Sequence, residues 1–173
     1  ALESFQQALA LYQSLGDKAD EAYALSNIGD FYKIQEEEQK AQEYYNQAVV
    51  LYQSLGDKTG EARFLTRLGN FQLSSLEQQK ALDYYNQALL LYQAASNKTG
   101  EARILSKIGG VYRYTFSEEQ KTLEYYQRAL PLYQAEGNKE GEATTLFNIA
   151  DYYDMIHDTE RALEFMRKAQ DIF

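Results

Sequence analysis

Apolar residues between positions 21 and 55 form two helical stripes separated by a short polar segment. In the first stripe, apolar or small residues recur at steps of three and four: Ala22, Leu25, Ile28, Gly29 and Tyr32. Glu36-Glu37-Glu38 interrupts the pattern, and the second stripe contains Ala41, Tyr44, Tyr45, Ala48, Leu51, Tyr52 and Leu55. This spacing is typical of helices that each bury one face, and the alternation expected of β-strands is absent. The pattern predicts a pair of helices, which we call helix A and helix B.

The helix pair recurs along the chain with a fixed period. The phrase that begins Leu-Tyr-Gln starts at Leu11, Leu51, Leu91 and Leu132, with offsets of 40, 40 and 41 residues. A period in this range predicts stacked supersecondary units rather than one central core. Within the phrase, Gly56 suits a left-handed residue at the end of helix B, and Asp57 suits the N-cap of the next helix A.

Small residues recur where the two helices must approach closely. Gly29, Gly69 and Gly109 occupy equivalent positions in helix A, with Ala150 in the fourth unit. Ala48, Ala88, Ala129 and Ala169 form a second series in helix B. Glycine in a helix interior costs about 1 kcal/mol relative to alanine, so its recurrence predicts tight packing between helices A and B. The paired tyrosines at 44–45, 84–85 and 125–126 are interpreted as part of the same core.

These positions resemble the tetratricopeptide-repeat pattern over essentially the whole chain. The first unit carries Leu25, Ile28-Gly29, Tyr32, Ala41, Tyr45 and Ala48, and the second Leu65, Leu68-Gly69, Gln72, Ala81, Tyr85 and Ala88. The third carries Leu105, Ile108-Gly109, Tyr112, Thr122, Tyr126 and Ala129, and the fourth Leu146, Ile149-Ala150, Tyr153, Ala162, Met166 and Ala169. The period exceeds the usual length of about 34 residues. This longer form resembles the arrays of kinesin light chains and of multidomain bacterial signalling proteins.

The repeat and the resemblance together define the expected fold. We expect an all-α, right-handed α-solenoid of antiparallel helix pairs, with nine helices in about four and a half repeats. The expected organisation is a single array over residues 1–173: an orphan helix B at 1–16, repeats at 17–56, 57–96 and 97–137, and a truncated repeat at 138–173. Because solenoids normally need polar caps, the apolar stripes of the terminal helices predict end-to-end self-association.

Composition and charge exclude several classes of partner. The 173 residues carry a formal net charge of −9, which disfavours nonspecific binding to nucleic acid and to anionic membranes. The chain has no cysteine and no apolar run near the ~20 residues of a membrane span. We therefore expect no nucleic-acid partner, no membrane partner and a cytoplasmic location.

Positions that differ between repeats are the candidates for function, because packing does not dictate them. One such stripe follows helix A at steps of four, three and four, on a face other than the core stripe. The resemblance places this face in a concave groove that holds peptides. The candidate peptide-binding residues are Asn27, Asp30, Arg63, Arg67, Asn70, Arg103, Lys107, Arg113, Tyr114, Asn148 and Asp151.

The middle of this stripe is basic in an acidic chain. Arg63 and Arg67 lie one helical turn apart, as do Arg103 and Lys107, and stacking predicts that the two pairs lie side by side. Because arginine offers a planar donor fork for carboxylates, we expect an acidic or carboxylate-bearing peptide, whose backbone the asparagines bind. The alternative is that Glu61, Glu101 or acidic residues of a neighbouring repeat neutralise the cations in surface pairs worth ~0–1 kcal/mol each.

No pattern in the sequence predicts catalysis. A Gly-rich phosphate loop, a cluster of metal ligands and a nucleophile–base pair are all lacking, and the single histidine, His157, stands beside Asp158 in a predicted turn. We expect no catalytic residue, no metal and no cofactor. The favoured function is a non-catalytic protein–protein interaction module that binds a peptide. The alternative is a structural spacer or self-association segment of a larger signalling protein, and recognition of single-stranded RNA is disfavoured by the net charge.

Overall fold

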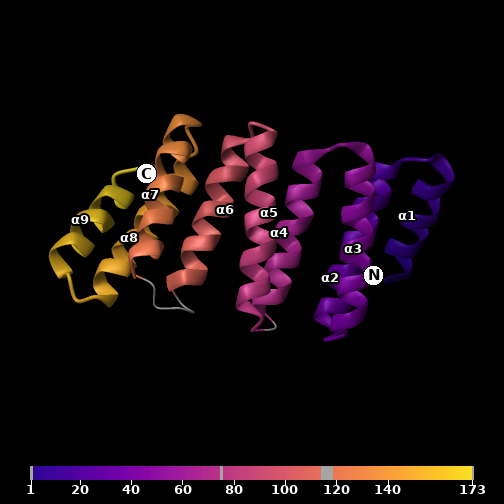
Figure 1. Ribbon diagram of the computed structural model, residues 1–173, viewed down its shortest axis with the longest axis horizontal. Coiled ribbons are helices and arrows are strands. Elements are labelled where there is room, and N and C mark those ends of the chain that lie inside the picture. The colour runs from indigo at the N-terminus through magenta and orange to yellow at the C-terminus, as the bar shows by residue number, and fades with distance from the viewer. Residues whose placement is uncertain (1, 75, 114–118, 173) are drawn as a thin grey trace. The chain divides into compact units, whose positions relative to one another are not determined.

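The computed structural model describes residues 2–74, 76–113 and 119–172, and within them the chain is built of helices and short turns (Figure 1). The helices are α1 (Leu2–Leu15), α2 (Lys18–Ile34), α3 (Glu38–Leu55), α4 (Lys58–Ser74), α5 (Gln78–Ala94), α6 (Lys98–Val111), α7 (Glu119–Ala135), α8 (Lys139–Met155) and α9 (Thr159–Gln170). The even-numbered helices are the predicted A helices, and the odd-numbered ones are the predicted B helices. None of them is long and apolar enough to cross a membrane.

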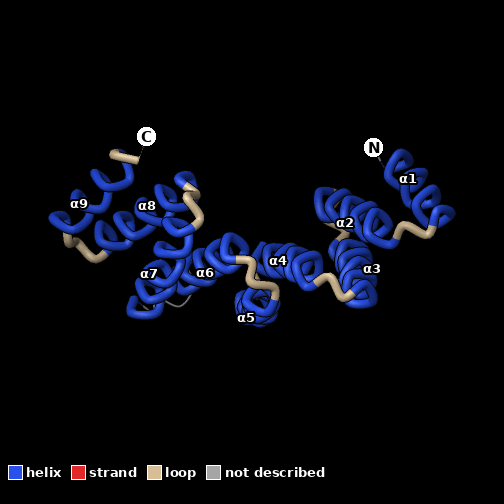
Figure 2. The backbone as a smooth tube through the Cα atoms, turned by 90° about the horizontal axis from the view of Figure 1, so that it is seen from above, coloured by secondary structure: helices blue, strands red, loops and turns tan. Residues whose placement is uncertain are grey.

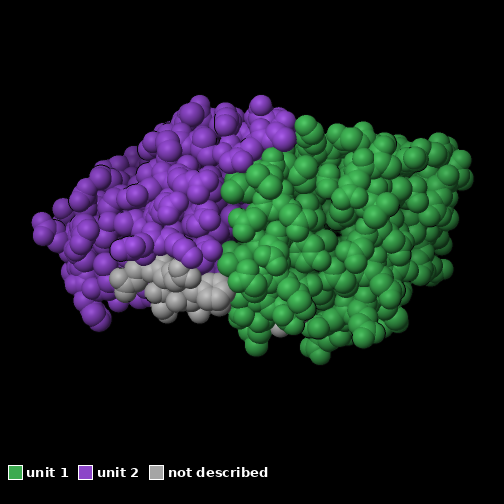
Figure 3. Space-filling model, in the orientation of Figure 1, with its two compact units in different colours: residues 1–91 green, residues 92–173 purple. Residues whose placement is uncertain are grey.

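The chain divides into two compact units, residues 1–91 and residues 92–173 (Figure 3). In unit 1, α1 packs against α2, α2 against α3, and α3 against α4. In unit 2, α6, α7, α8 and α9 pack in the same sequential way, and the two A helices α6 and α8 also touch (Figure 2). The boundary between the units falls inside α5, at Leu91.

The repeated phrase forms the turn from helix B to the next helix A. Gly56 adopts φ +67°, as the sequence predicts, and Gly16 and Gly137 do the same at +69° and +64°. Asp57 caps α4 by accepting a hydrogen bond from the Gly60 amide at 2.9 Å. A glutamine of helix B also donates to a glutamate of the next helix A in every copy: Gln13 to Glu21, Gln53 to Glu61, Gln93 to Glu101 and Gln134 to Glu142, at 2.8–3.1 Å.

The buried core lies between helices A and B, where tyrosine rings pack on glycines. Tyr45, Tyr85 and Tyr126 are at most 1% exposed. A Cβ atom added to Gly29 would lie 2.7 Å from the Tyr45 ring, so this glycine is required by close packing, as predicted. A second series of close glycine–tyrosine contacts was not predicted: Gly60, Gly100 and Gly141 pack against the rings of Tyr52, Tyr92 and Tyr133. Their recurrence within the sequence Gly-Glu-Ala was the available signal.

Candidate functional site

The residues of the predicted stripe are flanked along each A helix by buried residues, but they are themselves accessible to solvent. Arg63 on α4, Arg103 on α6 and Asp151 on α8 are exposed. The other described members are half-buried: Asn27, Asp30, Arg67, Asn70, Lys107, Arg113 and Asn148. Tyr114 lies outside the described residues. Because solvent reaches this face at equivalent positions of successive A helices, a ligand can reach it too.

In unit 1, Arg67 belongs to a network that joins three helices. Its guanidinium donates from Nη1 to Asp30 Oδ2 at 2.7 Å and to the Ser26 hydroxyl at 3.2 Å, both on α2. The other oxygen of Asp30 accepts the Tyr45 hydroxyl of α3 at 2.6 Å. Burial raises the pKa of Tyr45, and the bond to Asp30 raises it further. A carboxylate of the preceding repeat therefore neutralises Arg67, as the alternative interpretation of the stripe allowed.

The tyrosine hydrogen bond of this network recurs one repeat later, with an amide oxygen in place of the carboxylate as the acceptor. The Tyr85 hydroxyl of α5 donates to Asn70 Oδ1 of α4 at 2.8 Å, and burial raises the pKa of Tyr85 to about 12. Asp30 and Asn70 thus accept hydrogen bonds from the hydroxyls of buried tyrosines, a role that sequence reasoning missed. The signal was present, because a polar acceptor stands fifteen residues before the tyrosine in both repeats.

Arg63 and Arg103 have a different environment from Arg67. Within the described residues neither arginine forms an ion pair. The glutamates that the alternative interpretation pairs with the cations have other partners: Glu61 accepts from Gln53, and Glu101 accepts from Gln93 and from Lys98. Burial acts to raise the pKa of Glu101, but these two hydrogen bonds outweigh it and hold the pKa below its usual value. Both arginines are therefore exposed cations without an ion pair among the described residues, in a chain of net charge −9.

Lys107 lies one helical turn beyond Arg103 on α6. Burial lowers its pKa, and the neighbouring positive charge of Arg103 lowers it further. The depressed pKa means that the charged form of Lys107 is costly to the folded protein, chiefly because the side chain is buried.

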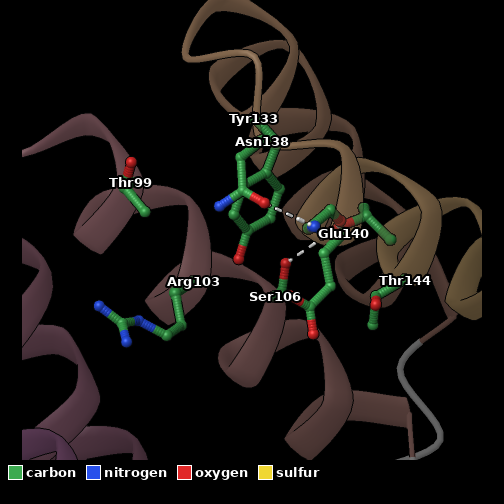
Figure 4. Close-up of a pocket in the computed structure, with 9 residues that line it drawn as sticks. Thr99, Arg103, Ser106, Tyr133, Asn138, Glu140 and Thr144 are labelled. Atoms are coloured by element: carbon green, nitrogen blue, oxygen red, sulfur yellow. Dashed lines mark hydrogen bonds between the residues drawn. The ribbon is translucent and has the colours of Figure 1, made fainter.

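A polar cavity of about 310 Å³ opens beside Arg103 in unit 2 (Figure 4). It is lined by residues of α6, α7, α8 and the turn before α8: Thr99, Arg103, Ser106, Tyr133, Asn138, Glu140, Gly141, Thr144 and Thr145. The hydroxyls of Ser106 and Thr145 lie 3.4 Å apart. In Figure 4 the guanidinium of Arg103 points away from Glu140, which comes from the opposite wall. The cavity therefore offers hydroxyl and amide groups, one cation, Arg103, and one carboxylate, Glu140.

Two further predicted residues meet at the edge of unit 2. Arg113, which follows α6, lies 3.5 Å from Asp151 of α8 through Nη1 and Oδ2. The Arg113 side chain is 10% exposed, so it is less accessible than the stripe predicts. The two basic pairs, on α4 and α6, belong to different units, and their expected side-by-side arrangement stays a prediction.

The described residues include no group of three or more histidine, cysteine, aspartate or glutamate side chains placed to hold a metal ion. His157 adopts φ +61° in the turn before α9. The candidate site is therefore a surface of arginine, lysine, amide and hydroxyl groups, which is suited to binding by hydrogen bonds and charge.

Comparison with known proteins identifies the family. A family model described as tetratricopeptide repeat matches residues 1–54 and 100–173. The chain belongs to the tetratricopeptide repeat family. A search of curated proteins finds no match.

Solved tetratricopeptide-like structures share the fold at low sequence identity. Aspartyl phosphate phosphatase F from Bacillus subtilis gives a TM-score of 0.85 at 15% identity over 97% of this chain and 44% of its own. A signal-transduction ATPase with numerous domains and a tetratricopeptide repeat sensor, from Pyrococcus horikoshii, gives 0.80 at 22% identity, over 98% of this chain and 27% of its own. Kinesin light chain-like repeats from Podosopora anserina give 0.73 at 13% identity, over 99% and 84%. The chain thus spans less than half of the first two proteins.

The tetratricopeptide assignment confirms the predicted fold class of antiparallel helix pairs. The resemblance seen in the sequence was to kinesin light chains and multidomain bacterial signalling proteins, and the similar structures include kinesin light chain-like repeats and the multidomain signal-transduction ATPase of Pyrococcus horikoshii. At these identities the likeness concerns the fold, and the partner has to be argued from this chain's own residues.

Proposed function

We propose that this tetratricopeptide array is a non-catalytic protein-interaction module that binds an acidic or carboxylate-bearing peptide segment along its A-helix face. The observation that supports the proposal most is the state of Arg63 and Arg103. Both are exposed at equivalent positions of α4 and α6, and neither forms an ion pair within the described residues. A chain with nine excess negative charges has carboxylates available for such pairs, yet leaves these two cations open.

The surroundings of Arg103 suit a peptide better than a simple anion. A guanidinium holds a carboxylate through two parallel hydrogen bonds. The hydroxyls of Thr99, Ser106 and Thr144 border the same cavity and can bond peptide groups. Because these side chains stand on helices packed against one another, little conformational entropy is lost on binding.

Arg67 has a supporting role in this proposal. Its bonds to Asp30 and Ser26 fix α4 against α2, so replacing it would disturb the fold as well as the surface. A test of the binding face should therefore change Arg63 and Arg103 and leave Arg67 in place.

The test is a screen of an unbiased peptide library against the parent chain and against the double variant Arg63→Glu/Arg103→Glu. Arg167→Glu is the matched control, because Arg167 is an exposed arginine on a B helix and forms no ion pair within the described residues. Circular dichroism establishes that all three proteins are folded. We expect acidic peptides to bind the parent and the control and to be lost from the double variant. Binding that survives in the double variant contradicts the proposal.

A second candidate function is self-association, and one observation favours it. No side chain of α1 is fully buried, and Leu11 and Leu15 are 56% and 69% exposed. An apolar helix face of this kind commonly packs against another protein surface. Light scattering over a range of concentrations tests this: a mass that rises with concentration, and falls back when Leu11 and Leu15 are changed to glutamate, supports self-association. A constant monomer mass rejects it.

A further inference from the structure

In three of the four helix pairs, the same arrangement of aromatic rings lies where helix A ends and helix B begins. In the first pair, the Tyr32 ring at the end of α2 stacks on the Tyr44 ring of α3, with 5.5 Å between centroids and 13° between planes. The ammonium of Lys40, from the start of α3, lies 5.0 Å from the Tyr32 centroid. A ring of helix A is thus held between a ring and a cation of helix B.

The two helix pairs of unit 2 repeat the arrangement with slightly different residues. Tyr112 stacks on Tyr125 at 5.6 Å and is covered by Lys121 at 4.8 Å. In the last pair, Tyr153 stacks on Phe165 at 5.5 Å, and the Arg161 guanidinium lies 4.4 Å from the Tyr153 centroid. Stack and cation therefore form one recurring feature.

The second helix pair keeps two of the three parts and lacks the central ring. Tyr84 of α5 and Lys80 are present, but Gln72 of α4 stands where the other repeats have tyrosine. Gln72 instead donates from Nε2 to Gln42 Oε1 of α3 at 2.7 Å. Within the part of the chain that the structure describes, Tyr84 has no ring contact and Lys80 covers no ring. Tyr84 is half-buried, so part of its side chain faces solvent.

Lys80 is nevertheless positioned as its counterparts are. Its ammonium lies 3.3 Å from Glu77, three residues earlier, and Lys40 pairs with Glu37 in the same way. A cavity of about 420 Å³ opens at this place in unit 1. It is lined by Glu38, Gln39, Gln42, Glu43, Phe71, Gln72, Glu77 and Lys80, so it is bordered both by the residue that replaces the ring and by the cation.

We propose that this gap is a docking site for an aromatic side chain of a partner polypeptide. The incoming tyrosine, phenylalanine or tryptophan ring enters this cavity, displaces the buried Gln72 side chain and lies against Tyr84 beneath Lys80, which completes the arrangement that the other repeats supply from within. The amide of Gln39 borders the cavity and provides a donor and an acceptor for the backbone beside that ring, as does the amide of Gln72 once its bond to Gln42 is broken. The site does not depend on Arg63 or Arg103, so it stands or falls separately from the proposed function.

The binding test uses a capped Gly-Gly-Tyr-Gly-Gly peptide and its leucine counterpart, followed by NMR of the labelled full chain. We expect the tyrosine peptide to shift the signals of Tyr84 and Lys80 with a dissociation constant on the order of 1 mM, since a single ring provides few contact atoms. The leucine peptide should not shift them. Equal shifts with both peptides, or no shift with either, overturn the proposal.

Two variants make the test specific to the missing ring. Gln72→Tyr supplies the chain's own ring, so we expect it to abolish peptide binding and to raise the melting temperature. Tyr32→Gln opens the equivalent gap in the first repeat and should create a second binding site, reported by Tyr44 and Lys40. Tyr125→Ala in the third repeat is the control and should leave binding at Tyr84 unchanged. Circular dichroism checks that each variant is folded, and undiminished binding in a folded Gln72→Tyr protein contradicts the assignment.

Discussion

The A-helix faces of the two units carry the same kinds of side chain, but their charges are arranged differently. In unit 1, Arg67 of α4 reaches back to Asp30 of α2 and is neutralised. In unit 2, Gly110 occupies the position of Asp30 and Asn148 that of Arg67, so this cross-repeat ion pair has neither partner. On α6, Arg103 and Lys107 are neighbouring cations one turn apart, and burial and then the charge of Arg103 lower the pKa of Lys107. The comparison teaches that the cross-repeat ion pair of Arg67 requires a carboxylate at one position of the preceding repeat.

The difference has an energetic consequence for each unit. In unit 1, Asp30 satisfies a buried tyrosine hydroxyl and an arginine together, and charge-assisted bonds of this kind are stronger than neutral ones. In unit 2, like charges one turn apart on α6 oppose folding, by about 0.2–0.5 kcal/mol for an exposed pair. We therefore interpret Arg67 and Asp30 of the first face as structural, and the face of α6 as the more open to a ligand.

The largest expected effect is the loss of the unit 1 network. Asp30→Ala leaves the buried Tyr45 hydroxyl and Arg67 without their shared acceptor, so we expect the free energy of unfolding to fall by about 2 kcal/mol. Asp151→Ala, which removes the exposed partner of Arg113, should cost about 0.5 kcal/mol. Urea unfolding measures both, and hydrogen exchange locates the loss in α2–α4 or in α6–α8. Equal costs for the two substitutions would contradict the contrast between the units.

A smaller effect is expected when the network is built into unit 2. Gly110→Asp with Asn148→Arg recreates the pair at equivalent positions, and a Cβ at Gly110 meets only the Tyr126 hydroxyl, at 3.7 Å. Removing a helical glycine and adding the pair should together stabilise the protein by about 1 kcal/mol. The two single variants complete a double-mutant cycle, and the account requires favourable coupling between them. Zero coupling in this cycle would show that these two positions do not determine whether the ion pair forms.

The smallest expected effect concerns the cations of α6. Arg103→Gln removes the charge that helps to depress the pKa of Lys107, so that pKa should rise, as NMR titration can measure. A folded-state pKa below the unfolded value means that protonated Lys107 destabilises the fold at neutral pH, and this cost vanishes as pH rises through the unfolded pKa near 10.4. Arg103→Gln should therefore stabilise the protein by about 0.3 kcal/mol at neutral pH.

The same substitution in unit 1 is the control for this prediction. Arg67→Gln breaks the bond to Asp30 and should destabilise the protein by about 1 kcal/mol. Opposite signs for two arginine-to-glutamine changes are the signature of the comparison. If both variants lose stability to the same extent, Arg103 has a structural partner and the interpretation of α6 is wrong.

The sequence predicts the fold well because the same packing residues recur at equivalent positions of each repeat. The buried positions on α2 and α3, the left-handed Gly56 and the close approach at Gly29 all follow from spacing, since helical periodicity fixes which side chains share a face. Local chemistry was also accessible, because the Asp57 cap involves residues three apart.

The pairing of the cations was not accessible in the same way. Arg67 and Asp30 are 37 residues apart, and whether their side chains meet depends on how two A helices pack, which spacing within one repeat does not specify. The glutamines that bind Glu61 and Glu101 lie in the preceding helix and were not recognised as competitors for those carboxylates. Likewise, the sequence shows Gln72 only as a departure from the tyrosine of the other repeats. The structure shows that this tyrosine is the central ring of a stack, which the second repeat therefore lacks.

The most direct test of the account is an NMR titration that follows the guanidinium NεH signals of individual arginines. An acidic peptide recovered from the library screen is added to the full chain at low salt. We predict that the signals of Arg63 and Arg103 each shift and saturate, while that of Arg67 stays in place because Asp30 already binds it. A saturating shift at Arg67 without shifts at Arg63 and Arg103 would contradict the account.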